Sequence, residues 1–493
     1  MDIIYIITPL ILISITLAAV WLDKWSVPVI LIALGGGILF GSDVLNLWYF
    51  DDTSVANHLA NFALVFILFH GGFGIKRQEL RAAALPAVGL AVWGVLLTAA
   101  VTFVVLWKGL GWSLEESALL AAIISSTDAA ATLSILRRYA LPRKLSSTLV
   151  IESAANDPMA ILLTVVVVQA LTAGNTQGLQ TVLSFGWKFT VGPIIGWLMA
   201  HAALWMLNRL RPRDRAHYYV LFLAIVLLTY GFAEGIHASG MLAVFVAGYV
   251  LGNHSFVHKQ GIANFSLAFS GLANIGVFVL LGLLVFPHQW GAIWWRGILL
   301  FLVLTFISRP LSVILGTLGM GIPAREKTFM VWAGLRGVVP IVFATYPAAA
   351  GLESSQEIFS LVFFAVVLSV LLQGSTLGQM ARALGLLTRR HAQGDPPYSL
   401  ELFTMVPSDK DLVTVQLPQE AAVAGPRIQD LRLPQGAVIT MITRGDEVIS
   451  PKGSTQLKCG DHITVLAGVQ DEEAVRDSLL HPFISPSDGE LQG

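Results

Sequence analysis

The chain has 493 residues, of which 55% are hydrophobic and only 12% are charged, and its formal net charge is −1. A soluble globular protein carries about 25% charged residues, so the composition excludes an ordinary soluble protein. The near-neutral charge also argues against a nucleic-acid partner, which would require a basic surface. The single cysteine, Cys459, excludes an internal disulfide framework and suits a reducing compartment.

Apolar runs long enough to cross a bilayer as helices recur from the N-terminus to about residue 388. They predict a polytopic α-helical membrane protein with about thirteen spans. We expect these spans at residues 3–21, 27–40, 57–74, 83–106, 115–136, 146–172, 181–207, 217–233, 237–253, 264–286, 291–320, 324–348 and 356–387.

The loops on the two sides of this arrangement differ in their content of Lys and Arg. One side carries only Lys108, Lys188 and Arg296, whereas the other carries clusters such as those at 76–81, 137–144 and 209–215. Cytoplasmic loops are enriched in Lys and Arg. We therefore expect an external N-terminus, a cytoplasmic C-terminus and spans in contact with membrane lipids.

The composition changes at "TRRHAQGDPPYS", which predicts a membrane domain at 1–388, a linker at 389–399, a small α/β domain at 400–482 and a tail at 483–493. Four alternating segments predict strands in the small domain, and "RGDE" between two of them predicts a hairpin turn. The segments are "LVTVQL", "AVITMIT", "EVIS" and "HITVLA". The run "QDEEAVRDSLL" predicts a closing helix.

The sixth span contains the polar stretch "IESAANDPMA", which places two carboxylates at membrane depth. Ser153 and Asp157 are four residues apart and share a helical face, while Glu152 and Asn156 share the adjoining face. Ionisable residues inside spans are costly in hydrocarbon and mark candidate functional sites. Packing hydrogen bonds explain Ser153 adequately, but they are a poor explanation for Glu152 and Asp157 together.

Two other spans contain residues that interrupt a helix. The fifth carries "IISSTDAAAT", with four polar residues from Ser125 to Asp128, and the twelfth carries "WAGLRGVVP", with Arg336 between two glycines. The offset of seven spans places the two breaks in segments of opposite direction. Broken helices at matching positions of inverted repeats indicate a secondary transporter.

Arg336 needs an anionic partner at this depth, for which Glu152, Asp128 and Asp157 are the candidates. Asp157 could hold either a proton or a metal ion, but not both at once. A carboxylate exposed to each side of the membrane in turn is the minimal requirement for a cation/proton exchanger. Because Asn156 adds no second titrating charge, the pattern suits one proton for one monovalent cation.

Two other function classes fit less well. A channel would need a conduction filter, and no loop of the "TVGYG" kind is present. An intramembrane enzyme would need a metal motif such as H-E-x-x-H or a base beside Ser153, and the sequence has neither. We therefore do not expect an enzyme, and we expect no cofactor beyond the transported ions.

The segments "STDAAAT", "ESAANDPMA" and "GLRGVVPIV" together resemble the cation/proton antiporter-1 family, in particular its cell-volume-regulation branch of bacterial potassium/proton antiporters. The resemblance covers nearly the whole membrane region. It implies the NhaA- and NhaP-like antiporter fold with thirteen spans, a six-helix core, a dimerisation domain, a homodimer and an elevator-like motion. It also favours K⁺ over Na⁺, which remains the alternative ion.

The resemblance also implies roles for individual residues. Asp157 corresponds to the essential carrier of the proton and the cation. Ser153 and the backbone of Thr127 correspond to direct ligands of the cation, and Asp128 assists through water. Asn156 corresponds to the residue that marks electroneutral exchangers.

Glu152 and Arg336 correspond to the family's structural ion pair. The sequence departs from the family pattern at Ala129, where proline is common, and at His70, where many relatives have an acid. His70 is therefore a candidate pH-responsive group, with a purely structural role as the alternative. Glu234, Arg309 and His201 have no assigned role, although "ISRP" suggests that Arg309 lies at a kink and pairs with a core carboxylate.

The soluble domain resembles the C-terminal lobe of potassium-conductance regulators, an RCK_C or TrkA-C-like domain. The segments that carry this resemblance are "LVTVQLP", "DLRLPQGAVITMITRGDEVISPKG" and "GDHITVLAG". No glycine-rich dinucleotide fingerprint follows a strand in it. Two roles stay open, namely binding of a small, nucleotide-type regulator and a structural dimer clamp.

Overall fold

The computed structural model describes all residues except 1, 23–28, 42–43, 46–49, 51, 78–79, 81–88, 128–140, 173–177, 211–213, 287, 289, 353, 388–397, 399, 401, 403–407, 418–424, 446 and 481–493. The chain forms two units. The first comprises residues 1–204, 219–254 and 265–388, and the second comprises residues 205–218, 255–264 and 389–493. The predicted linker and tail lie almost entirely outside the described residues.

Eight helices among the described residues are long and apolar enough to cross a membrane. They include α3 (Thr53–Gly74), α8 (Arg143–Thr172), α9 (Gly178–Leu210), α10 (Ala216–Gly235) and α12 (Lys259–Leu283). The other three are built around α5 (Val95–Val104), α13 (Trp290–Val303) with α14 (Arg309–Gly316), and α18 (Ser355–Leu368) with α19 (Ser375–Ala383). The chain is therefore a multi-pass membrane protein, as predicted.

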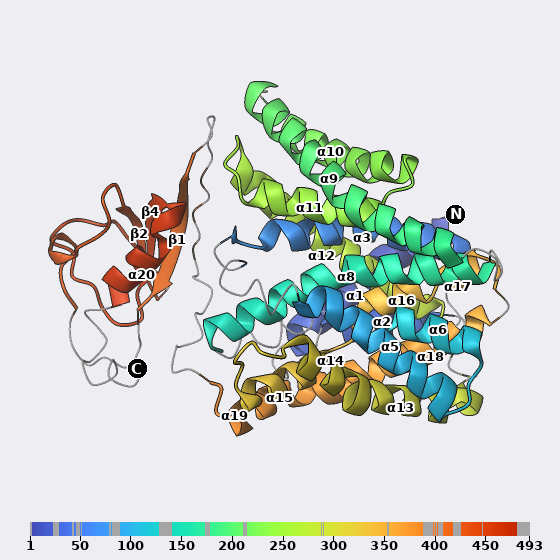
Figure 1. The fold of residues 1–493 in the computed structure, drawn as a ribbon. Helices are drawn as coiled ribbons and strands as arrows, with labels where there is room; N and C mark the ends of the chain where they lie inside the picture. Colours follow the sequence, from blue (N-terminus) through green and yellow to red (C-terminus); the bar gives the residue numbers. More distant parts are fainter. Residues whose placement is uncertain are drawn as a thin grey trace. The chain divides into compact units, whose positions relative to one another are not determined.

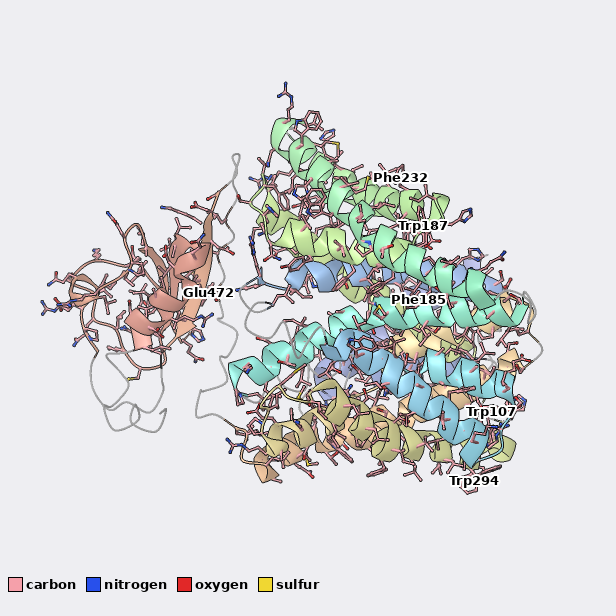
Figure 2. All side chains as sticks on the ribbon, viewed as in Figure 1. Trp107, Phe185, Trp187, Phe232, Trp294 and Glu472 are labelled. Carbon is pink, nitrogen blue, oxygen red and sulfur yellow. The ribbon has the colours of Figure 1, made fainter. Side chains whose placement is uncertain are left out.

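Further helices of this unit are α1 (Asp2–Leu22), α2 (Val29–Phe40), α6 (Leu114–Ile123), α11 (Gly240–Gly252), α15 (Ala324–Trp332), α16 (Val338–Phe343) and α17 (Tyr346–Ala349) (Figure 1). The count of thirteen spans stays a prediction, because residues 128–136 of the predicted fifth span lie outside the described part. Large apolar side chains such as Trp187, Phe232 and Trp294 are exposed on the helices (Figure 2), as expected for surfaces that face lipid.

The predicted helix breaks are present. Helix α6 ends at Ile123, and Ser126 and Thr127 are not helical. Helix α15 ends at Trp332, and the chain becomes helical again only at Val338. A third irregularity, a π-helical turn at Leu304–Ser308, separates α13 from α14 and places Arg309 at the start of the second helix.

Helices α3 and α11 pack closely because glycines line their contact. A Cβ atom added at Gly72, Gly248 or Gly252 would lie only 2.2 Å from a carbonyl oxygen of the facing helix. Small residues at this spacing let two backbones approach each other in a membrane, where dispersion and hydrogen bonds replace the hydrophobic effect. Substitution of these glycines would therefore push the two helices apart.

The C-terminal part of the second unit contains a four-stranded antiparallel sheet in the order β1-β4-β2-β3. Its elements are β1 (Lys410–Gln416), β2 (Val438–Arg444), β3 (Glu447–Ile449), β4 (His462–Gly468) and α20 (Glu472–Leu480). These strands and this helix confirm the elements predicted from the sequence. The side chains of alternating strand residues, among them Val415, Ile442 and Val465, form a core with Leu479 of α20.

A buried acid is satisfied at one end of this sheet. Arg444 donates from Nε and Nη2 to the two carboxylate oxygens of Asp461, over 2.7 and 2.8 Å. Asp461 is fully buried and also accepts from the backbone N–H of Lys458. The hydrogen bonds to Asp461 raise the pKa of Arg444 above its ordinary value, so the guanidinium stays charged throughout the physiological range.

Candidate functional site

The two predicted helix breaks meet in the structure. Arg336, in the break between α15 and α16, donates from Nη1 to the backbone carbonyl of Ser126 in the break after α6. The backbone N–H of Arg336 donates to Ser369 Oγ at 3.1 Å, and Ser369 Oγ donates to Gln373 Oε1 at 2.5 Å. Backbone groups that a break frees must find partners at membrane depth, and here a cation and a buried side chain supply them.

Helix α8 contributes a cluster of polar side chains beside the first break. Asn156 Nδ2 donates to Thr127 Oγ1 at 2.6 Å, and Thr127 Oγ1 lies 3.1 Å from Ser153 Oγ. All three side chains are buried. The hydroxyl of Thr127 therefore joins two consecutive turns of α8, and Asp157, which is half-buried, follows directly after Asn156.

Several buried oxygens around this cluster have no hydrogen-bond partner among the described residues. They are Ser126 Oγ, Glu152 Oε2 and Asn156 Oδ1. A buried acceptor left without a partner costs about 1–3 kcal/mol. Uncompensated oxygens of this kind fit a place that takes a cation or water during function, since both supply positive partners for oxygen.

The predicted ion pair between Glu152 and Arg336 is wrong, because the structure gives Glu152 a different partner. Arg309 Nη1 lies 2.6 Å from Glu152 Oε1, and the side chains are only 4% and 1% exposed. Arg309 also donates from Nη2 to the carbonyl of Met330 at 3.2 Å. The expectation that Arg309 pairs with a core carboxylate is confirmed, and a π-helical turn directly precedes it.

Local geometry explains why Arg309 reaches Glu152. The π-helical turn before Arg309 inserts one residue into the helical register and turns the following side chain toward the core. Gly334 leaves the space for the guanidinium, since a Cβ at this position would lie 2.4 Å from Arg309 Nε. Arg336 meanwhile lies within Coulomb range of both Glu152 and Arg309.

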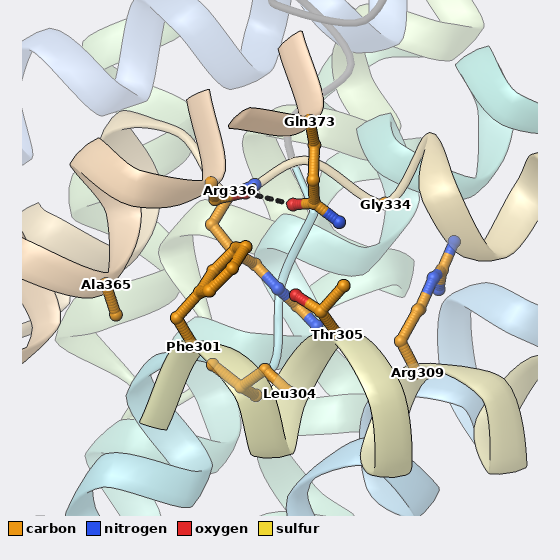
Figure 3. A pocket seen from close by; sticks show the side chains of 9 residues that line it. Phe301, Leu304, Thr305, Arg309, Gly334, Arg336, Ala365 and Gln373 are labelled. Atoms are coloured by element: carbon orange, nitrogen blue, oxygen red, sulfur yellow. Dashed lines mark hydrogen bonds between the residues drawn. The ribbon is translucent and has the colours of Figure 1, made fainter. Parts of the chain in front are cut away.

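The two arginines line the same small cavity, of about 10 Å³. Figure 3 shows their side chains entering it from different elements, together with Thr305 and Gln373. Sequence reasoning missed Ser369 and Gln373, although the amide of "VLLQGS" in an otherwise apolar span was a signal. One carboxylate thus sits beside two cations, one in direct contact and one at longer range.

The remaining predicted residues have varied positions. Asp128 lies outside the described residues, so the structure does not test its role. His70 is half-buried, and its Nδ1 lies 3.2 Å from Ser266 Oγ of α12. His201 packs on Trp197 and meets His254 edge to face, with ring centroids 5.7 Å apart.

A larger cavity, of about 130 Å³, lies further along α8. It begins at Ile161, one helical turn after Asp157, which is a rise of about 6 Å along the axis. Its lining includes the previously unassigned Glu234. The polar residues that line it are Asn61, Lys188, Tyr230, Glu234, Ser239 and Tyr346.

Two family models match the chain. The model described as "Sodium/hydrogen exchanger, transmembrane" matches residues 10–383, which includes both helix breaks and the polar cluster of α8. The chain belongs to the sodium/hydrogen exchanger family. The C-terminal domain of this exchanger matches the TrkA-C model over residues 412–480, which confirms the resemblance seen in its sequence.

Curated relatives of this exchanger carry antiporter names. The K(+)/H(+) antiporter NhaP2 of Shewanella oneidensis is 34% identical over 92% of this chain and 79% of its own length. The K(+)/H(+) antiporter NhaP of Alkalimonas amylolytica is 31% identical over 95% and 81%. The Na(+)/H(+) antiporter NhaP of Pseudomonas aeruginosa is 28% identical over 64% and 79%.

The fold of this exchanger also matches a solved structure. The sodium proton antiporter MjNhaP1 of Methanocaldococcus jannaschii superposes with a TM-score of 0.66 over 76% of this chain and 97% of its own, at 23% identity. This likeness confirms the predicted NhaP-like antiporter fold.

Proposed function

We propose that this exchanger moves K⁺ out of the cell in return for H⁺, one for one, with Asp157 as the group that holds either ion. The observation that carries the proposal is the position of Thr127. Its hydroxyl, at the end of a broken helix, contacts Ser153 and Asn156 in the two turns of α8 that lead to Asp157. A carboxylate, hydroxyls and a freed backbone together form the oxygen-rich environment that an alkali cation needs.

In this mechanism the cation binds to deprotonated Asp157, with Ser153 and the Thr127 carbonyl as further ligands. Protonation of Asp157 on the other side of the membrane neutralises the carboxylate and releases the cation. Asn156 supports Thr127 without adding charge. Asp128 assists through water.

The surrounding ion pair and hydrogen bonds keep the site in shape. Arg309 pairs with Glu152, so the charge of this second carboxylate on α8 is compensated beside the site. Arg336 anchors the first break to the second through Ser126. A rigid frame of this kind keeps the ligand geometry constant. The ion bound at Asp157 then determines when the site opens to the other side of the membrane.

K⁺ is favoured over Na⁺ by the names of the relatives. The relatives named for K⁺ are more than 30% identical and match over 90% of this chain, whereas the one named for Na⁺ matches 64%. Na⁺/H⁺ exchange is the second candidate, because MjNhaP1, with the same fold, is named a sodium proton antiporter.

The proposal includes an assembly and an orientation. The exchanger works as a homodimer in a bacterial inner membrane, with its N-terminus outside and its C-terminal domain in the cytoplasm. Boundaries at 388 and 400 separate the transport domain from a TrkA-C-like domain that regulates it, through a nucleotide-type ligand or as a dimer clamp. His70, near the C-terminal end of α3, adds a response to pH.

Reconstitution into proteoliposomes with an internal pH dye tests the function. K⁺ pulses should move protons in the wild type and fail to do so in Asp157→Asn. Asp477→Asn, the same substitution at an exposed position of α20, serves as the matched control and should leave exchange intact. Proton movement on Na⁺ pulses but not on K⁺ pulses would overturn the choice of ion.

A further inference from the structure

The cavity beyond Asp157 is lined by residues of α3, α9, α10, α11 and α17, together with α8. Its lining lies at the end of α10 and at the starts of α11 and α17, whereas Asn61 and Lys188 lie about two to three turns inside α3 and α9. The Lys and Arg distribution assigns the nearest end of each of these helices to the external side. Helix α8 itself, through Ile161, Leu162 and Val165, forms the wall of the cavity nearest to the proposed carrier.

The cavity contains two opposite charges. Lys188 of α9 is half-buried, and Glu234 at the end of α10 acts on it electrostatically. Both residues line the cavity. Lys188 lies inside the predicted span at 181–207, where a charge marks a candidate functional site, whereas Glu234 is exposed and follows directly after the predicted span at 217–233.

Glu234 is held in a fixed position. Its Oε1 accepts a hydrogen bond from the backbone N–H of Gly240 at the start of α11, at 2.8 Å. A Cβ at Gly240 would lie 2.6 Å from the ring of Tyr230 and 2.9 Å from the side chain of Glu234. The glycine therefore lets the acid and the tyrosine pack over the helix end at the rim of the cavity.

The cavity lining also includes the neutral oxygens of Asn61 and Tyr346. Tyr346 donates its hydroxyl proton to Asn61 Oδ1 at 2.5 Å, and Asn61 Nδ2 donates to Asn57 Oδ1 at 2.8 Å. This chain of hydrogen bonds fixes the hydroxyl of Tyr346 and the amide of Asn61 beside the cavity. The cavity thus combines one anionic group, several neutral oxygens and one tethered cation.

We propose that this cavity is an external binding vestibule for a monovalent cation, in which Glu234 attracts the ion and Lys188 weakens its binding. The proposal rests on the exchange function proposed above and adds a second, external ion position to it. Glu234 raises the local concentration of cations at the outer mouth, as charged clefts do. Lys188 competes for the same carboxylate, so that an exported ion leaves instead of staying bound.

Side-specific transport kinetics test the vestibule. The half-saturating K⁺ concentration is measured from the outer face in right-side-out vesicles and from the cytoplasmic face in everted vesicles. Glu234→Gln keeps the acceptor for Gly240 and removes only the charge. It should raise the outer half-saturating concentration about fivefold, the size expected for one charge at close range in a partly solvated site, and leave the cytoplasmic value unchanged.

Lys188→Met removes the opposing charge and should lower the outer value by a similar factor. Glu115→Gln, the same substitution at the start of α6 outside the cavity, is the matched control and should change neither value. The opposite signs of the two vestibule variants are a result that loss of folding cannot produce.

An outer half-saturating concentration that is unchanged in both variants would overturn the vestibule, as would equal changes at the two faces. The same titrations with Na⁺ keep this result independent of which cation is transported. A wild type that exchanges protons with neither cation would instead overturn the exchange function, and the vestibule with it.

Discussion

Arg309 on α14 and Glu152 on α8 form an ion pair with a separation of 2.6 Å, and both side chains are almost completely buried. The pair joins α8 to α14 through residues 157 positions apart in the sequence. A buried pair adds little net stability, but removal of one partner strands a charge in a medium that cannot solvate it. We therefore expect loss of this ion pair to affect mainly the stability of the fold.

Glu152→Gln and Arg309→Met should therefore each lower the unfolding temperature of the purified protein, because each leaves an uncompensated group that costs about 3–5 kcal/mol. The double variant should recover most of the loss. Thermal unfolding in detergent measures all three. Single variants with wild-type stability would rule out the pair as a structural element.

Gly334 makes the Arg309 position possible, and its substitution should show this. Gly334→Ala should destabilise the protein, because the new Cβ would lie 2.4 Å from Arg309 Nε. Gly271→Ala on α12 is the matched control, since a Cβ there meets no atom within 4 Å, and it should be neutral or slightly stabilising. Equal unfolding temperatures for the two variants would contradict the steric argument.

Thr127 should matter for the affinity of the transported cation. Thr127→Val keeps the shape but removes the hydroxyl that contacts Ser153 and Asn156. The amide of Asn156 then loses its acceptor, at a cost of about 1–3 kcal/mol, and the polar cluster loosens. We expect a higher half-saturating K⁺ concentration than in Thr172→Val, a control near the end of α8, and no difference between them would argue against a role for the Thr127 hydroxyl.

Acidification should loosen the loop that leads into α12. Burial, and secondarily the charge of Arg215, lower the pKa of His258 below its ordinary value. Because the folded form disfavours the proton, the stability that neutral His258 contributes is present above about pH 6.5 and is lost as the pH falls below that value. His258 also packs edge to face on Tyr218, with ring centroids 5.0 Å apart.

Hydrogen exchange of residues 255–264 at pH 7.5 and pH 5.5 measures this effect. The segment should lose protection at the lower pH in the wild type. The pH effect should shrink in His258→Asn, since asparagine tolerates the positive φ of 65° at this position. His217→Asn, at an exposed neighbouring position, should retain it; equal protection at both pH values in the wild type would refute the prediction.

Much of the fold follows from local patterns in the sequence. Apolar length sets the spans, breaker residues set the breaks at 125–127 and 334–337, and alternation sets the strands of the C-terminal domain. The cluster of Thr127, Ser153 and Asn156 was also predictable, because spacing on α8 and the resemblance to a family point to the same residues. Each of these features depends on residues close together in the sequence.

The partner of Glu152 was not predictable in this way. Two arginines lie within reach of one carboxylate, and the choice between them depends on a π-helical turn and on space left by Gly334. Neither the π-helical turn nor this space can be recognised from the pattern of apolar residues. The cavity that Lys188 and Glu234 line was missed for a similar reason, since its lining is assembled from helices that are far apart in the sequence.

Competition between the proton and the cation for Asp157 is tested most directly by the half-saturating K⁺ concentration as a function of pH. With one shared carboxylate, this concentration should rise tenfold for each unit of pH decrease once the carboxylate is mostly protonated, while the maximal rate at saturating K⁺ stays constant. A half-saturating concentration that does not depend on pH would show that the two ions occupy separate groups, and Asp157 would then not be the shared carrier.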